Sequence, residues 1–343
     1  NTLTSIGNLG NLLQVKGDLA AAELLQREAL EGKRETLGNR HPNTLASINN
    51  LALLLMDKGD LAAAERLSRE ALKVQRETLG NRHPNTLSSI NNLGELLRAK
   101  GDLAAAEPLL REALEVSRET LGNRHPDTLI SIRALGMLLM AKGNLAAAEL
   151  LLREALEGSR ETLGDRHPET LAAMSNLGKL LRAKGDLAAA EPLSREALEV
   201  QRETLGNRHP GTLASINNLG LLLRAKGDLT AAEPLTREAL EVKRETLGDR
   251  HPSTLASINN LGALLQVKGD FAAAEPLYRE ALEVQRETLG YRHPHTLISI
   301  SNLRLLLSRR RLEYIASSCR SSSLLSMTTC AAVCAILLSV FCA

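Results

Sequence analysis

Residues 43–84 read NTLASINNLALLLMDKGDLAAAERLSREALKVQRETLGNRHP, and this 42-residue unit decides the fold because the chain repeats it. A Gly-Asp step marks the period, with an Asn replacing one Asp; its glycines are Gly17, Gly59, Gly101, Gly143, Gly185, Gly227 and Gly269. A fixed period of this length is typical of stacked units that bury their apolar faces only against their neighbours. The sequence therefore predicts a repeat array.

Each unit is predicted to contain two antiparallel helices, which we name A and B. In residues 43–84 the apolar stripe of helix A comprises Leu45, Ile48, Leu51, Ala52 and Leu55, and that of helix B comprises Leu61, Ala64, Leu67, Ala71 and Leu72. Gly59 supplies the left-handed residue that ends helix A, and Asp60 caps the start of helix B. Because the connection is so short, the helices must be antiparallel, and the fold class is all-α.

The surface of helix B carries regular charges and, in some repeats, a proline. Glu107 and Arg111 stand four residues apart and are expected to form one of many stabilising pairs on a solvated face. Prolines in the second turn remove a backbone donor, so we predict a bend there without a break. These prolines are Pro108, Pro192, Pro234 and Pro276.

Composition argues against several functional classes. The net charge is only +2, from 42 basic and 40 acidic side chains, and Trp is absent, so no nucleic-acid partner is expected. The repeats contain no Cys, which favours a cytoplasmic location. The recurring histidines stand about 8–10 Å apart in adjacent units, too far to share a metal ion; they are expected to pack or hydrogen-bond in the connecting loops. Without a recognisable catalytic or phosphate-binding motif, we expect no enzyme activity, cofactor or metal.

The repeats resemble a known family. His83-Pro84-Asn85-Thr86-Leu87, Asn91-Asn92-Leu93-Gly94, Gly101-Asp102 and Arg111-Glu112-Ala113-Leu114 are similar to the 42-residue tetratricopeptide (TPR) repeats of kinesin light chains and nephrocystin-like proteins. The resemblance covers residues 1–308. It implies an α-solenoid, a right-handed superhelix of seven helix pairs and a final A helix, beginning within a longer protein.

The resemblance also implies that the stacked A helices form a concave surface for extended peptides. An asparagine row follows this face, interrupted by Ala134; it consists of Asn8, Asn50, Asn92, Asn176, Asn218, Asn260 and Asn302. Such a row can pair with a peptide backbone whatever its side chains, or each Asn can bridge helices within its own repeat. Neighbouring positions are mainly basic and predict an acidic peptide ligand; they are Glu95, Arg98, Arg133, Lys179, Arg182 and Arg224.

Repeat four departs from the pattern. Arg133-Ala134 replaces the usual Asn-Asn, and Met137 and Met140 follow it. Two interpretations stay open, namely sequence drift and a local pocket that determines ligand specificity.

Residues 309–343 form a tail outside the repeats. The period would next place Gly at position 311, where the chain has Arg311. Residues 324–343 are mostly apolar and about as long as a membrane span, and the preceding arginines would keep the repeats cytosolic. The tail is therefore either a membrane anchor or an artefact of gene prediction.

The expected function is that of a non-enzymatic interaction scaffold, a kinesin-light-chain-like adaptor for cargo or other partners. Its partners would be proteins or peptides, including kinesin heavy chain or another motor or signalling subunit. Two alternatives remain: a sensor arm of an NB-ARC-type signalling ATPase, and a tail-anchored membrane scaffold. The latter requires that residues 324–343 belong to the protein.

Overall fold

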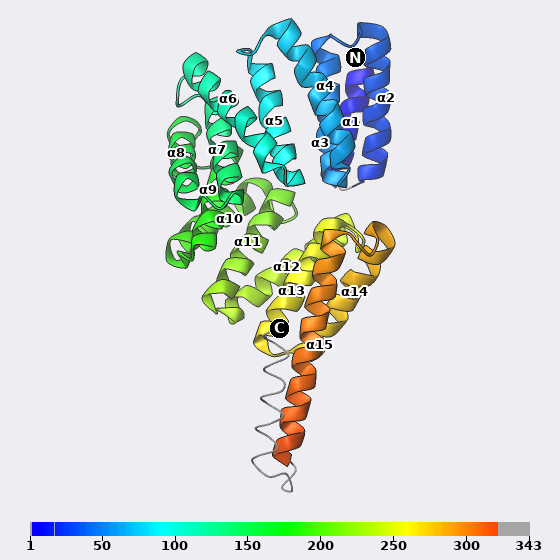
Figure 1. Cartoon of the computed structure of the whole chain (residues 1–343), viewed down its shortest axis with the longest axis vertical. Coiled ribbons are helices and arrows are strands. Elements are labelled where there is room, and N and C mark those ends of the chain that lie inside the picture. Colours follow the sequence, from blue (N-terminus) through cyan, green and yellow to red (C-terminus); the bar gives the residue numbers. More distant parts are fainter. Residues whose placement is uncertain (1, 17, 322–343) are drawn as a thin grey trace. The chain divides into compact units, whose positions relative to one another are not determined.

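The computed structural model describes residues 2–16 and 18–321, and over this part of the chain it consists of helices in successive antiparallel pairs (Figure 1). The A helices are α1 (Thr2–Lys16), α3 (Pro42–Lys58), α5 (Pro84–Lys100), α7 (Pro126–Ala141), α9 (Pro168–Lys184), α11 (Pro210–Lys226), α13 (Pro252–Lys268) and α15 (Pro294–Ser321). The B helices are α2 (Leu19–Leu37), α4 (Leu61–Leu79), α6 (Leu103–Leu121), α8 (Leu145–Leu163), α10 (Leu187–Leu205), α12 (Leu229–Leu247) and α14 (Phe271–Leu289). The α-solenoid predicted from the period is confirmed.

The helix ends follow from the loop residues. Gly59 ends α3 in the left-handed region, with φ of 85°, and the Asp60 carboxylate accepts a hydrogen bond from the backbone N of Ala63 at 3.0 Å. His41 caps the start of α3, because its Nδ1 accepts from the backbone N of Asn43 at 3.1 Å while Pro42 is the first helical residue. The histidines thus hydrogen-bond in the inter-repeat loops, as predicted. Their repetition reflects a helix-capping role.

The prolines of helix B do not interrupt it. Pro108 lies inside α6, which runs unbroken from Leu103 to Leu121, and α10, α12 and α14 likewise continue through theirs. Pro108 is exposed, as is Ala104, whose carbonyl the proline leaves without its helical donor. Water can therefore hydrate that carbonyl, which explains why the array tolerates proline at this position.

The core lies between the A and B helices. The predicted stripe of α3 is fully buried, and of the α4 stripe only Leu61 is partly exposed. A small residue on helix A allows helix B to approach closely: a Cβ added to Gly94 would lie 2.4 Å from Cδ2 of Leu110. Gly262 faces the ring of Tyr278 in the same way. Complementary small and large residues therefore set how each pair packs.

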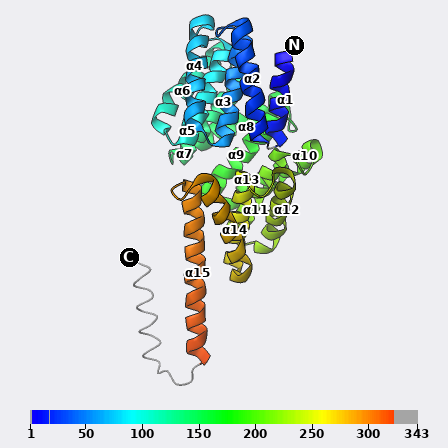
Figure 2. The same cartoon turned by 90° about the vertical axis from the view of Figure 1, so that its right-hand side faces the viewer.

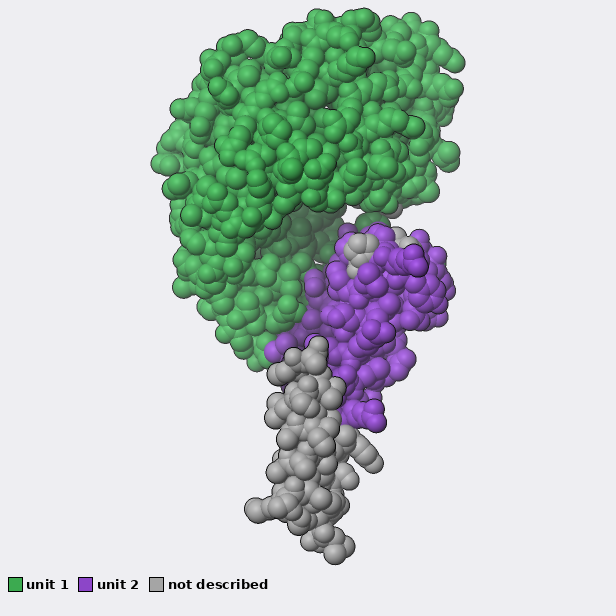
Figure 3. Space-filling model, in the orientation of Figure 1, with its two compact units in different colours: residues 1–251 green, residues 252–343 purple. Residues whose placement is uncertain are grey.

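The described chain forms two compact units, residues 1–251 (unit 1) and residues from 252 onward (unit 2; Figure 3). In unit 1, each A helix approaches the next A helix more closely than each B helix approaches the next B helix. The A helices consequently form the inner layer of a curved array, and the B helices form its outer layer (Figure 1). This curvature gives the A layer a concave face.

In unit 2, α15 extends well beyond its contacts with α13 and α14 (Figure 2). Helical structure thus continues past residue 308, and Arg310 takes the place that lysine has in earlier repeats. None of the described helices combines the length and apolar composition needed to cross a membrane. The apolar segment 324–343 lies outside the described residues.

Candidate functional site

Many charged side chains of the outer, B-helix layer form ion pairs, both within a helix and with the next repeat. Glu107 accepts a hydrogen bond from Arg111 of its own helix at 2.7 Å and another from Lys142 of the next repeat. The same arrangement holds at Glu23, Glu65, Glu149, Glu191 and Glu275, where Arg310 replaces the lysine at the last site. We call these six glutamates with their cations the glutamate ladder. Its hydrogen bonds lower the pKa of every one of these carboxyls.

Two further sets of ion pairs join a B helix, or the loop that follows it, to the next B helix. Arg76 of α4 donates to both carboxylate oxygens of Glu112 of α6, at 2.8 and 2.7 Å, and Arg82 pairs with Glu119 at 3.1 Å. Equivalent pairs recur in unit 1. The predicted pair of Glu107 and Arg111 is thus confirmed, and the outer layer's charges mainly hold neighbouring repeats together.

One row of asparagines on the A layer also bridges repeats. Asn91 of α5 donates from Nδ2 to the Oγ of Ser131 on α7 at 2.8 Å, and Asn49 donates to Ser89 at 2.9 Å. These residues are the first members of the Asn-Asn pairs, which the sequence analysis did not single out. The signal that could have identified them is the serine that recurs 40 residues later.

The predicted asparagine row consists of the second members of those pairs together with Asn8, Asn176 and Asn302, and its members in unit 1 behave differently. Among the described residues, the side chains of Asn50, Asn92, Asn176 and Asn218 make no hydrogen bond, although Asn176 is only 9% exposed. The bridging role therefore belongs to the first asparagine row. The amides of the second row in unit 1 remain available at the inner face.

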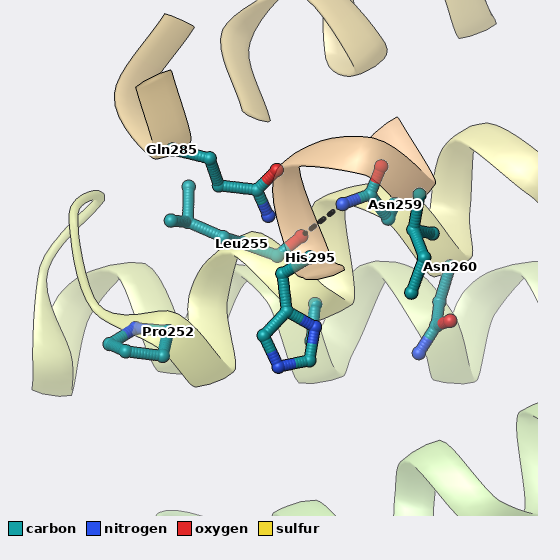
Figure 4. A pocket seen from close by; sticks show the side chains of 8 residues that line it. Pro252, Leu255, Asn259, Asn260, Gln285 and His295 are labelled. Carbon is teal, nitrogen blue, oxygen red and sulfur yellow. Dashed lines mark hydrogen bonds between the residues drawn. The ribbon is translucent and has the colours of Figure 1, made fainter. Parts of the chain in front are cut away.

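Unit 2 contains a pocket of about 160 Å³ on its A layer, between α13 and α15 (Figure 4). Asn260 lines it together with Asn259, Gln285 and His295. Asn259 is held by hydrogen bonds from its Nδ2 to the Leu255 carbonyl at 3.2 Å and to the Oγ of Ser299 at 2.9 Å. Asn259 therefore bridges α13 and α15, as the first-row asparagines of unit 1 bridge their repeats.

Four cations of the A layer converge in unit 1, and we call them the cationic cluster. Lys179 and Arg182 lie one turn apart on α9, Arg133 lies on α7, and Arg98 lies on α5. Burial lowers the pKa of Lys179, and the positive charges of Arg98, Arg182 and Arg133 lower it further. The structure thus brings three predicted arginines within electrostatic range of Lys179.

Two members of the cationic cluster have acidic partners. Arg98 donates to Oε2 of Glu95, three residues earlier on α5, at 2.7 and 3.1 Å. Arg133 pairs with Glu169 of α9 at 3.2 Å. Its Nε and the Oε1 of Glu95 are buried without a hydrogen-bond partner. Intramolecular pairing therefore neutralises only half of the cluster.

The other two members have no partner. Within residues 2–16 and 18–321, the side chains of Lys179 and Arg182 form neither an ion pair nor a hydrogen bond. Arg224 occupies the position of Arg182 in the next repeat, on α11, but it makes an interaction of its own and is not one of the unpaired cations. The A layer of unit 1 consequently presents uncompensated positive charge beside free amides, an arrangement suited to an anionic, hydrogen-bonding ligand. No group of three or more potential metal ligands occurs in the described part of the chain.

Comparison with protein families identifies the class of protein. A tetratricopeptide repeat model matches residues 45–119, 88–161, 129–203, 169–245, 212–283 and 253–311, and a second tetratricopeptide repeat model matches residues 2–43. The chain therefore belongs to the tetratricopeptide repeat family. A search of the curated proteins gave no match.

Several solved structures are similar to the chain. The nearly identical TPR-like repeats of a putative kinesin light chain from Podosopora anserina are 29% identical, cover 60% of this chain and 98% of their own, and give a TM-score of 0.51. BtubC (BKLC) from P. vanneervenii is 25% identical over 69% of this chain and 94% of its own, with a TM-score of 0.54. These similarities confirm the kinesin-light-chain-like type of repeat.

A more distant structure shares only the fold. The Rap conjugation gene regulator of the plasmid pLS20, solved in complex with the Phr* peptide, is 14% identical. The match covers 85% of this chain and 77% of that one, with a TM-score of 0.64.

Proposed function

We propose that the chain is a non-enzymatic interaction scaffold that binds extended, acidic peptide segments of partner proteins along the A layer of unit 1. The observation that carries this proposal is the cationic cluster, in which Lys179 and Arg182 have no acidic partner among the described residues, while the ladder cations of the outer layer are paired. A carboxylate bound here would replace water at two partly buried cations with charge-assisted hydrogen bonds.

The asparagine row supplies the second half of the proposed recognition. An extended peptide exposes one N–H and one C=O per residue, and a carboxamide both donates and accepts. The free amides of Asn92 and Asn176 flank the cationic cluster along the array, one on α5 and one on α9. Backbone pairing at the amides would hold any sequence, and the cluster would select acidic ones.

The kinesin-light-chain-like repeats support a particular biological form of this activity. An array of this type would act as an adaptor that carries cargo or another partner, with a motor or signalling subunit as its second partner. The proposed peptide groove is the element that such an adaptor needs.

Isothermal titration calorimetry on the full chain tests the proposal. The probe is the peptide acetyl-Ala-Glu-Ala-Glu-Ala-Glu-Ala-amide, and its matched control carries Lys in place of each Glu. We expect binding of the acidic peptide only, and its loss in Arg182→Glu but not in Arg111→Glu of the outer layer. Equal binding of both peptides, or an equal loss in both variants, would contradict the proposal.

A further inference from the structure

We infer that the cationic cluster recognises a phosphorylated side chain of the bound peptide; this inference rests on the proposed function and names the ligand group at the same site. The cluster combines four positive charges with the two carboxylates of Glu95 and Glu169. Two positive charges are therefore uncompensated. A phosphomonoester carries a charge of about −1.5 to −2 at neutral pH, which matches that excess more closely than one carboxylate does.

The positions of the cations favour a single concentrated charge over a row of separate ones. Lys179 and Arg182 lie one turn apart on α9, while Arg133 of α7 and Arg98 of α5 lie within electrostatic range of Lys179. Carboxylates on the same side of an extended peptide are about 7 Å apart, so most would fall outside such a cluster. The three acceptor oxygens of one phosphoryl group can contact several converging donors at once.

The local departures of repeat four fit the same ligand. Arg133 stands where the preceding repeat has the bridging Asn91, so α7 contributes a cation at the place where α5 contributes a structural amide. Ala134 takes the place of a second-row asparagine, so α7 contributes no second-row amide beside the cluster. Recognition at this point of the array therefore depends on charge.

The same geometry argues against a membrane surface as the source of the phosphoryl group. The cluster lies on the inner layer of unit 1, and the side chains of Lys179, Arg182, Arg133 and Arg98 are all partly buried. A flat bilayer surface cannot follow the inner side of a curved array. A flexible peptide can.

Fluorescence anisotropy with labelled peptides acetyl-Ala-Ala-Ala-X-Ala-Ala-Ala-amide tests the inference on the full chain, where X is phosphoserine, Glu or Ser. We expect the phosphoserine peptide to bind at least about tenfold more tightly than the Glu peptide, and the Ser peptide not to bind. Lys179→Met with Arg182→Met should abolish this preference. Lys184→Met with Arg153→Met, which removes two ladder cations including one from α9, should preserve it; circular dichroism confirms that both variants fold.

The outcomes separate the two levels of the proposal. Equal affinity for the phosphoserine and Glu peptides would overturn the phosphoryl inference and leave acidic-peptide binding intact. Absence of binding for these peptides and for the alternating Ala-Glu peptide would overturn both. Displacement of the phosphoserine peptide by inorganic phosphate at equal concentration would identify free phosphate as the ligand and reject a peptide. Vesicles containing phosphatidylinositol phosphates that bind through Lys179 and Arg182 would likewise overturn the inference.

Discussion

The outer and inner layers of unit 1 use the same charged residue types to different ends. In the outer layer Glu107 sits between Arg111 and Lys142, and most repeats reproduce this arrangement. In the inner layer the position of Lys179 changes from repeat to repeat and is Glu95 on α5. Positions that stack neighbouring repeats carry the same residue type in each repeat, whereas positions without this structural role vary. In an internally repetitive chain, variation between repeats therefore marks the surface available for a ligand.

Charge reversal should separate the layers most strongly. Lys179→Glu with Arg182→Glu should weaken binding of the alternating Ala-Glu peptide by about 100-fold or more, because attraction becomes repulsion in a partly desolvated site. Lys184→Glu with Arg153→Glu makes the same charge change on the glutamate ladder and should alter the affinity less than about threefold. Calorimetry measures both, and comparable losses would remove the distinction between the layers.

Acid is expected to weaken the stabilisation that the glutamate ladder gives to the outer layer. The ladder hydrogen bonds, from lysine of the next repeat at five of the six sites and led by Arg279 at Glu275, hold the pKa of each carboxyl below its ordinary value of 4.5. A lowered folded-state pKa means that the ladder stabilises the array above about pH 4.5 and that this contribution is lost as pH falls through the folded-state values. Each glutamate of the ladder, with its cations, contributes up to about 1 kcal/mol to the free energy of unfolding.

Circular dichroism at 222 nm between pH 6 and pH 3 follows this loss. Glu107→Gln should lower the stability at neutral pH and reduce the dependence of stability on pH, because one titrating carboxyl of the ladder has already been removed. An acid transition unaffected by Glu107→Gln would place the relevant carboxyls elsewhere.

Alanine substitutions in the two asparagine rows should affect different properties, stability in the first row and peptide affinity in the second. Asn91→Ala removes the bridge to Ser131 and should cost about 1 kcal/mol of unfolding free energy, with little effect on peptide affinity. Asn176→Ala should change stability by less than about 0.5 kcal/mol and weaken peptide binding several-fold. Urea denaturation and calorimetry on the two variants give the comparison. A larger loss of stability in Asn176→Ala would mean that the second row is structural.

The smallest expected effect is a change in stability, and its sign differs between a lysine of the cationic cluster and a lysine of the glutamate ladder. Burial and neighbouring positive charges lower the pKa of Lys179, so its charged form opposes folding at neutral pH. Lys179→Met should therefore stabilise the chain, by about 0.5–1 kcal/mol, and this gain should shrink as pH rises and the lysine loses its proton. Lys184→Met should instead destabilise it by about 0.5 kcal/mol, because the ladder loses a cation. Thermal denaturation at pH 7 and pH 10 distinguishes the cases.

The sequence predicted the fold well because its signals are local and repeated. The period, the Gly59-Asp60 connection and the apolar stripes determine the helices and their order. The asparagine row and the basic positions could be located by counting residues. Counting residues could not show which asparagine of an Asn-Asn pair bridges two repeats, because this depends on which amide contacts a serine of the next A helix.

The approach of Arg98 to Lys179 could not be predicted by counting residues either. Arg98 and Lys179 lie two repeats apart, and only the curvature of the inner layer brings their charges together. The capping role of His41 similarly depends on the conformation of the loop, which presents its Nδ1 to the start of the helix. Distances that span repeats follow from the curvature of the array, which the repeat sequence alone does not specify.

The most direct test of the difference between the layers is a pH titration of lysines by NMR, using ¹³C-methyl groups attached by reductive methylation of the full chain. Without peptide, Lys179 should titrate below the ordinary lysine range, and its pKa should rise when the alternating Ala-Glu peptide binds, because an adjacent anion favours the charged form. A pKa of Lys179 that stays the same when the peptide binds would contradict the account.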